Sequence, residues 1–386
     1  MEPVKIKEGV YWVGAVDWGL RNFHGYSTSR GSTYNAYLII DEKITLIDTV
    51  KERFFDEMTE RISKIIDPSK IDIIVSQHVE MDHSGSLPRL MELCPGAEIY
   101  ASPNGVRGLK AHYRKAWPFK EAKGGDTLSM GERSLRFLLT PMVHWPDNMV
   151  SFCPEEKILF SNDSFGQHIA SSERFDDSYP FDTVMEEAAK YYANIVLPYS
   201  PQVRKELEAA SGLDVAVIAP SHGLVFRSKV KNIIGAYQEW AGNKTKKKAV
   251  IVYDTMWKST EKMAVSLASA FESKAYGFKM MSLGENHISD IMTEFLDAEI
   301  LCVGSPTLNN NMLPTTASFL TYLKGLSPGG RKALAFGSYG WGGQSVSLME
   351  KELEAAGLSL MEGFKVNYVP DEAQLKNIKE DLEKRI

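Results

Sequence analysis

Four possible metal ligands lie within six residues of this chain, at His78, Glu80, Asp82 and His83. The segment just before them, 71–75, is short and apolar and predicts a buried strand. The four side chains therefore follow a strand end, where a rigid sheet can hold them in position. Two imidazoles and two carboxylates without a thiolate suit iron, manganese or zinc. Packing gives no reason for this mixture at this spacing, so the segment predicts a metal site.

Three more candidate ligands follow predicted strands further along the chain, at His144, Asp163 and His222. If all these strand ends lie at one edge of the fold, seven ligands converge. That number is too large for one tetrahedral zinc ion and suits two metals that share a carboxylate. Taken alone, each of the three has another explanation: a histidine after a strand is often only hydrogen-bonded, and Asp163 lies in an Asn-Asp-Ser sequence that favours a turn.

The composition of the chain indicates which partners the protein is not expected to bind and in which compartment it is expected. A net charge of −6 argues against nucleic acid or an anionic membrane as the main partner. We find neither a signal-peptide pattern at the N-terminus nor an apolar run of about 18 residues, so we expect no membrane span. The cysteines at 94, 153 and 302 are widely spaced and predict buried thiols in a reducing cytoplasm. Without a Cys-x-x-Cys pair, we expect neither an attached rubredoxin module nor a redox dithiol.

Two domains are predicted, with a boundary in the polar segment 242–248. Residues 1–245 alternate short strands with helices. The boundary segment carries three adjacent lysines and is interpreted as a solvated linker. In residues 249–386, five strands alternate with five helices, which predicts a doubly wound parallel sheet.

Three loops of the second domain predict a flavin site. Hydroxyl side chains lie where the first strand turns into a helix, and the free backbone N–H groups there favour a phosphate. No Gly-x-x-x-x-Gly-Lys or Gly-x-Gly-x-x-Gly follows that strand, which disfavours a triphosphate or Rossmann site. Two later loops are rich in glycine and aromatic residues, as in flavodoxin-like domains that hold FMN. The alternative is a flavodoxin-like domain without flavin. The predicted FMN contacts are Thr255, Met256, Trp257, Lys258, Ser259, Thr260, Pro306, Thr307, Leu308, Asn309, Asn310, Ser338, Tyr339, Gly340, Trp341, Gly342 and Gly343.

The order His-x-Glu-x-Asp-His, followed by His, Asp and His, resembles the metallo-β-lactamase superfamily. That superfamily usually carries His-x-His-x-Asp-His and binds zinc. Glu80 replaces the usual second histidine, and this departure resembles one branch, the flavodiiron proteins. The sequences Tyr-Asp-Thr-Met-Trp, Pro-Thr-Leu-Asn-Asn and Tyr-Gly-Trp-Gly-Gly resemble the flavodiiron version of flavodoxin. The resemblance covers essentially the whole chain and implies an αβ/βα sandwich followed by a flavodoxin-like FMN domain.

This resemblance implies an oxidoreductase that reduces dioxygen to water, nitric oxide to nitrous oxide, or both. It implies that His78, Glu80 and His144 hold one iron, that Asp82, His83 and His222 hold the other, and that Asp163 bridges them. His24 and Tyr199 are candidates for hydrogen bonds to the bound gas or its product, although each could equally be an ordinary loop residue. The family also implies a head-to-tail homodimer, or a dimer of dimers, and a separate donor such as rubredoxin.

Three other functions stay open from the sequence. The first is an oxidase of the same family that takes electrons from a reduced deazaflavin coenzyme. The second is a zinc hydrolase fused to a flavodoxin-like domain, against which Glu80 and the FMN loops argue. The third is an electron carrier with a vestigial metal site, which the seven filled ligand positions disfavour.

Overall fold

The strand that precedes the ligand cluster is buried on both faces, which explains its unbroken apolar sequence. In the computed structural model, which describes residues 2–386, this strand is β9 (Ile73–Val75). Ile73 and Val75 pack into a core between two sheets, and Ile74 packs into a second core on the opposite face. The two cores place β9 at the centre of a layered unit.

Two sheets face each other in this first unit. Strands β7 to β9 and β13 to β16 contribute the apolar residues between them, for example Ile39, Phe137 and Phe160. The first sheet has the order β1 (Val4–Lys7), β2 (Val10–Trp12), β7 (Tyr37–Ile39), β8 (Thr45–Ile47), β9, β10 (Glu98–Ala101) and β11 (Phe119–Glu121). The second has the order β12 (Thr127–Ser129), β13 (Ser134–Leu139), β14 (Met149–Cys153), β15 (Ile158–Asn162) and β16 (Val217–Pro220). A separate pair joins β3 (Ala15–Asp17) to β6 (Ser32–Tyr34).

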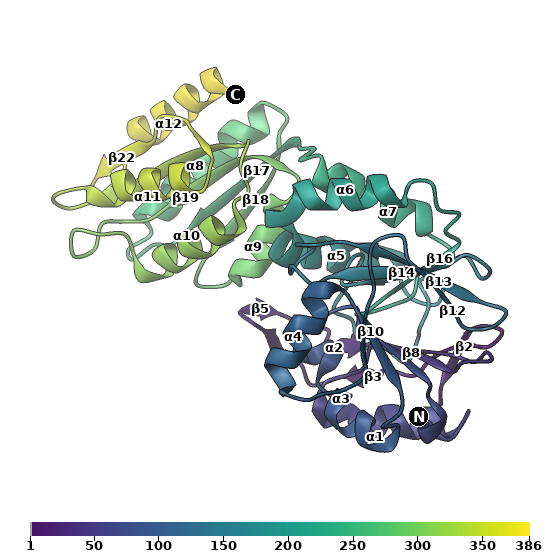
Figure 1. Cartoon of the computed structure of the whole chain (residues 1–386). Helices are drawn as coiled ribbons and strands as arrows, with labels where there is room; N and C mark the ends of the chain where they lie inside the picture. The colour runs from purple at the N-terminus through teal and green to yellow at the C-terminus, as the bar shows by residue number, and fades with distance from the viewer. Residues whose placement is uncertain (1) are drawn as a thin grey trace. The chain divides into compact units, whose positions relative to one another are not determined.

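Helices cover the outer faces of both sheets. Met58, Leu90 and Leu109 come from three different helices and pack with the outward side chains of the first sheet. Figure 1 shows the other three long helices of this unit beside the second sheet. The helices are α1 (Phe55–Ser63), α2 (Met81–Ser84), α3 (Leu87–Leu93), α4 (Pro103–Tyr113), α5 (Phe181–Tyr191), α6 (Ser200–Ala210) and α7 (Val230–Ala241). The predicted αβ/βα sandwich is therefore confirmed.

The second unit is the predicted doubly wound parallel sheet (Figure 1). Its strands run in the order β18 (Gly277–Ser282), β17 (Lys246–Tyr253), β19 (Ala298–Gly304) and β20 (Lys332–Tyr339). The fifth position is shared by two short strands that both pair with β20, β21 (Ser359–Leu360) and β22 (Phe364–Asn367). Helices α8 (Ser259–Ser273) and α12 (Glu372–Arg385) pack together over one face. The remaining helices are α9 (Ile288–Phe295), α10 (Pro314–Leu326) and α11 (Gln344–Ala355).

The polar segment between the domains differs from the predicted solvated linker. Strand β17 already begins at Lys246, and Lys246 and Lys248 place their Nζ atoms 2.7 and 2.9 Å from the Asp297 carboxylate. These ion pairs join residues about fifty positions apart, which a local charge pattern cannot reveal. Two short segments, Gly25–Ser27 and Tyr192–Pro198, group with the second unit although they lie within the first part of the sequence. Among the described residues, no helix is long and apolar enough to cross a membrane.

Two glycines of the second unit allow a matched test of its packing. A Cβ on Gly304 would lie 2.3 Å from the Phe336 ring, whereas one on Gly325 would meet nothing within 4 Å. We expect Gly304→Ala to destabilise the unit by about 1–3 kcal/mol through overpacking. Gly325 lies in α10. Gly325→Ala should instead stabilise the unit by about 0.5–1 kcal/mol, because alanine loses less backbone entropy than glycine when the helix folds. Calorimetric melting temperatures check both, and equal temperatures for the two variants would contradict this account.

Candidate functional site

The seven candidate ligands lie at the ends of strands in the first unit. His78 follows β9, and Glu80 precedes the short helix α2, which carries Asp82 and His83. The Oγ atom of Ser84 donates to the carbonyl of Val79 at 2.6 Å and fixes the start of this helix. The others follow strands of the second sheet, His144 after β13, Asp163 after β15 and His222 after β16.

Asp163 lies between two pairs of imidazoles. Its Oδ1 atom is 3.2 Å from Nε2 of His83 and 3.3 Å from Nε2 of His222. Its Oδ2 atom is 3.5 Å from Nε2 of His144 and 3.8 Å from Nε2 of His78. Each oxygen thus faces its own pair of nitrogen atoms, which is the arrangement a bridging carboxylate requires.

The other two carboxylates each belong to one of these pairs. The Oε2 atom of Glu80 is 3.3 Å from Nε2 of His78 and 3.6 Å from Nε2 of His144. The carboxylate of Asp82 lies 3.5 Å from Nε2 of His83 and 3.4 Å from Nε2 of His222. The site therefore consists of two clusters that share Asp163.

Buried carboxylate oxygens show that the site suits cations. Both oxygens of Asp82 and both of Asp163 are buried, and none has a hydrogen-bond partner among the described residues. Buried charges without partners are costly, so a pair of cations would stabilise them. Separations of 3.2–3.8 Å between donor atoms are those expected when each atom is about 2.0–2.2 Å from a shared ion. The donor set fits two metal ions.

Without a metal, protons take the place of the cations. Burial opposes the charged imidazole of His78, but its contacts with Asp147 and Glu80 outweigh burial and raise the pKa of His78 to about 9. Burial likewise opposes charge on His222, yet the carboxylates of Asp163 and Asp82 raise its pKa to about 9. Burial disfavours the Asp163 carboxylate, but the neighbouring histidines hold its pKa well below the ordinary value. Metal binding must therefore displace protons from this site.

Partners behind the ligands fix the direction of two imidazoles. The Nδ1 atom of His78 is 2.9 Å from Oδ2 of Asp147, and Nδ1 of His222 donates to the Thr33 carbonyl at 2.7 Å. These bonds leave each Nε2 atom facing the centre of the site. Sequence reasoning missed Asp147, for which the only signal is its place three residues after His144.

Asp48 accepts hydrogen bonds from three of the loops that carry candidate ligands. It is 2% exposed, and its Oδ1 atom accepts from the backbone N–H of Gln77 at 2.7 Å. Its Oδ2 atom accepts from Nδ2 of Asn162 at 3.3 Å and from Oγ of Ser221 at 3.4 Å. Each of these three partners immediately precedes a candidate ligand. Asp48 was also missed, because it lies thirty positions from the cluster and no local pattern marks the distant residues that it bonds.

His24 and Tyr199, the two candidates for hydrogen bonds to the gas or its product, lie in different surroundings. The Nε2 atom of His24 is 3.2 Å from Oε1 of Glu80, so His24 lies beside the site with 74% of its side chain exposed. Tyr199 lies at the start of α6, and within residues 2–386 it makes no hydrogen bond or ring contact with the seven ligands. Two residues that were not proposed also lie beside the ligands: the His168 ring is 5.2 Å from the His222 ring, and the Tyr191 ring is 6.0 Å from it.

The three predicted FMN loops lie at the carboxyl ends of β17, β19 and β20. These strands are neighbours and parallel, so their loops meet at one edge of the sheet. Thr307 donates its N–H to the carbonyl of Ser338 at 3.0 Å, and the hydroxyls of Thr260 and Ser338 lie 3.3 Å apart. Several of the predicted contacts adopt left-handed backbone conformations, namely Lys258, Asn309, Asn310, Gly342 and Gly343.

Unsatisfied groups at this edge suit a phosphorylated flat ring. The Oγ1 atom of Thr255 is buried and has no hydrogen-bond partner among the described residues, so it is available to a phosphate. Trp257 and Trp341 are 87% and 81% exposed, which is unusual for such large apolar residues. A bound flavin ring would cover apolar surface that is otherwise left in water.

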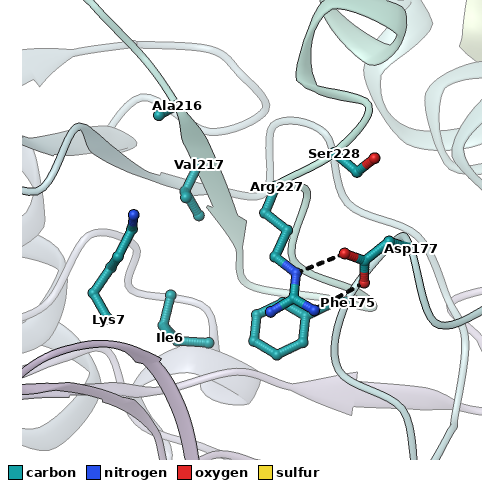
Figure 2. A pocket seen from close by; sticks show the side chains of 8 residues that line it. All are labelled: Ile6, Lys7, Phe175, Asp177, Ala216, Val217, Arg227 and Ser228. Atoms are coloured by element: carbon teal, nitrogen blue, oxygen red, sulfur yellow. Dashed lines mark hydrogen bonds and ion pairs between the residues drawn. The ribbon is translucent and has the colours of Figure 1, made fainter.

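A hollow of about 500 Å³ lies elsewhere in the first unit (Figure 2). One of its lining residues is Arg227, whose guanidinium is already paired with a carboxylate. Arg227 donates from Nε and Nη2 to the Asp177 carboxylate at 2.8 and 3.0 Å. Its guanidinium also stacks on the Phe175 ring, 3.6 Å from the centroid. This pairing leaves Arg227 little capacity for an anionic ligand.

Both halves of the chain match known families. Residues 33–223 match the ODP family beta lactamase, and residues 251–381 match Flavodoxin. The chain is 46% identical over 376 residues to a protein named nitric oxide reductase from Moorella thermoacetica, an alignment that covers 96% of this chain and 94% of the relative.

Solved structures agree over the full length. The rubredoxin oxygen:oxidoreductase of Desulfovibrio gigas superposes with a TM-score of 0.96 at 44% identity and covers 99% of this chain and 98% of its own. The flavodiiron protein of Giardia intestinalis superposes with a TM-score of 0.95 at 35% identity and covers 100% and 97%. The fold and the paired sites define a two-domain flavin and non-haem iron oxidoreductase. The chain belongs to the flavodiiron proteins, whose cofactors are FMN and a pair of non-haem irons.

Replacing Asp48 tests the support beneath the metal site. In Asp48→Asn, the amide keeps one acceptor oxygen but places its NH2 group against the donor of either Gln77 or Asn162, so one of the loops should lose its hydrogen bond. We expect the metal affinity to fall by about 10–100-fold, as for other partners behind metal ligands. Metal analysis after dialysis against a chelator checks this. Asp182→Asn, an exposed change at the start of α5, is the control, and full metal retention in Asp48→Asn would contradict the supporting role.

Proposed function

We propose that this protein reduces dioxygen to water, nitric oxide to nitrous oxide, or both, at a diiron site supplied with electrons by FMN. The observation that carries the proposal is the shared position of Asp163, each of whose oxygens faces a separate imidazole pair. Relatives named nitric oxide reductase and rubredoxin oxygen:oxidoreductase support both substrates.

We assign His78, Glu80 and His144 to one iron, Asp82, His83 and His222 to the other, and Asp163 to the bridge. When bound, two irons supply one electron each at adjacent positions where a diatomic gas can be reduced. The neutral imidazoles keep the site available near neutral pH once their protons are displaced, and the carboxylates offset the charge of the oxidised metals. His24, next to Glu80, is proposed to hydrogen-bond the substrate or product.

The two cofactors belong to separate domains, for which we propose the limits 1–245 and 249–386. The seventeen predicted contacts in the three loops are proposed to hold FMN. Electron transfer needs short gaps, so we propose a head-to-tail homodimer, or a dimer of dimers, in which one subunit's FMN serves the partner's irons. We further propose a cytoplasmic location and a separate donor, with rubredoxin favoured by the name of a relative.

A second candidate differs only in the electron donor. A relative in Methanocaldococcus jannaschii, 40% identical over 403 residues, is named coenzyme F420H(2) oxidase. An oxidase of a reduced deazaflavin coenzyme would use the same metal and flavin sites. Comparing reduced rubredoxin with the reduced deazaflavin coenzyme as donors decides between the two.

The choice of substrate is tested by direct measurement. Anaerobically purified protein should contain iron at both clusters together with FMN, and should consume gas when reduced rubredoxin is supplied. We expect consumption of dioxygen, nitric oxide or both, monitored with gas electrodes. A preparation with zinc in both clusters and esterase activity would instead support the hydrolase alternative.

Glu80 is proposed to set the preference for iron. Glu80→His would restore the zinc-type ligand pattern and remove a hard anionic donor. We expect the iron affinity relative to zinc to fall roughly tenfold or more. Metal content after growth with equal iron and zinc checks this, with Glu92→His on the exposed surface of α3 as control. Unchanged iron content and activity would contradict this role of Glu80.

A further inference from the structure

A cavity of about 360 Å³ lies between α6 and the outer face of the second sheet, and none of the seven candidate ligands lines it. The sheet contributes Leu138, Val150 and Leu159, the outward-facing residues of β13, β14 and β15. Phe165 closes one side. The walls are mainly apolar, and the volume lies in the range of small-molecule sites.

The cavity arises from the sequence of α6. The buried residues of this helix are Val203 and Glu206. The next turn presents Ala209 and Ala210, whose methyl groups are too short to fill the space above the sheet. A helix that packs through one valine and one glutamate leaves a gap larger than the voids of an ordinary core.

Two side chains that line the cavity each carry a buried oxygen atom without a partner. Glu206 is 8% exposed, and its Oε2 atom accepts from Oγ of Ser164 at 2.9 Å. Its Oε1 atom is buried and has no hydrogen-bond partner among the described residues, and the same holds for Oε1 of Gln202. These two side chains are four positions apart on α6, so they lie on the same face of the helix. Both line the cavity.

The unpartnered atoms specify the head group of a ligand. Two acceptors need at least two donors, and a primary ammonium offers three whereas a hydroxyl offers one. Burial raises the pKa of Glu206 to about 7 against the opposing hydrogen bond from Ser164, and a cationic partner would favour the ionised carboxylate. Lys205 at the mouth is exposed, so its charge is screened by solvent.

We propose that this cavity binds a small aliphatic primary amine, with the ammonium between Glu206 and Gln202 and the alkyl chain against the sheet. The site is separate from the diiron and FMN sites and does not depend on the function proposed for them. It would give the protein a second, non-redox ligand.

The test uses the full-length holoprotein and isothermal titration calorimetry. The probes are n-hexylamine, 1-hexanol and methylamine, which separate the contribution of the ammonium from that of the chain. We expect saturable binding of hexylamine to one site, and binding of the other two that is weaker by at least about tenfold, since each lacks one part of the interaction. Failure of hexylamine to saturate, or equal affinity for hexanol, would overturn the proposal.

Two variants and a control place the binding in the cavity. Glu206→Gln removes the charge with little change of shape, and Ala209→Phe fills the space from the exposed side of the helix. Both should weaken hexylamine binding by about tenfold or more, whereas Glu208→Gln, an exposed change on the same helix, should leave it unchanged. Unchanged affinity in Ala209→Phe would overturn the assignment, and this variant decides the outcome if Glu206→Gln does not fold.

Discussion

The metal site depends on one buried carboxylate that is not itself a candidate ligand. Asp48 accepts hydrogen bonds from residues just before His78, Asp163 and His222, and so ties together loops from both sheets. The partners come from positions up to 173 residues away in sequence. Strand pairing joins the strands within each sheet but not the two sheets to each other, so hydrogen bonds of this kind hold their strand ends in a common register. The hydrogen bonds to Asp48 therefore help to fix the positions of the candidate ligands.

The ligands themselves work against the stability of the metal-free fold. Burying the carboxylates of Asp82 and Asp163 without hydrogen-bond partners is costly, and in the metal-free state only protonated histidines offset that cost. Binding of cations converts this cost into a stabilising interaction, so metal binding and folding of the loops are linked. Glu80 adds a further negative charge to one cluster, which suits a hard, oxidisable metal better than the neutral imidazole found in zinc-binding relatives of the fold.

Both units place their chemistry at the carboxyl ends of strands, although they do so with different groups. In the first unit, strand ends deliver charged side chains to a buried centre. In the second, neighbouring parallel strands deliver backbone turns and hydroxyls, while Trp257 and Trp341 stay exposed. The first arrangement suits metal ions, which need several close donors, and the second suits a large planar group that needs surface contact. This division explains why the chain places its two kinds of chemistry in two separate units.

The sequence by itself determined which residues could bind metal, which three loops could hold a flavin, and the doubly wound parallel sheet of the second unit, because residue type and strand periodicity are local properties. The sandwich of the first unit was expected from the family resemblance alone. The tertiary structure alone decided which carboxylate stands between the two imidazole pairs and which partners lie behind the ligands. The roles of Asp48 and Asp147 could not be predicted from the sequence, since nothing near an aspartate in a loop or turn indicates which distant residue it will bond. The ion pairs of Lys246 and Lys248 were missed for the same reason, because their acidic partners lie far along the chain. Local patterns specify which chemistry is available, and long-range packing specifies which atoms meet.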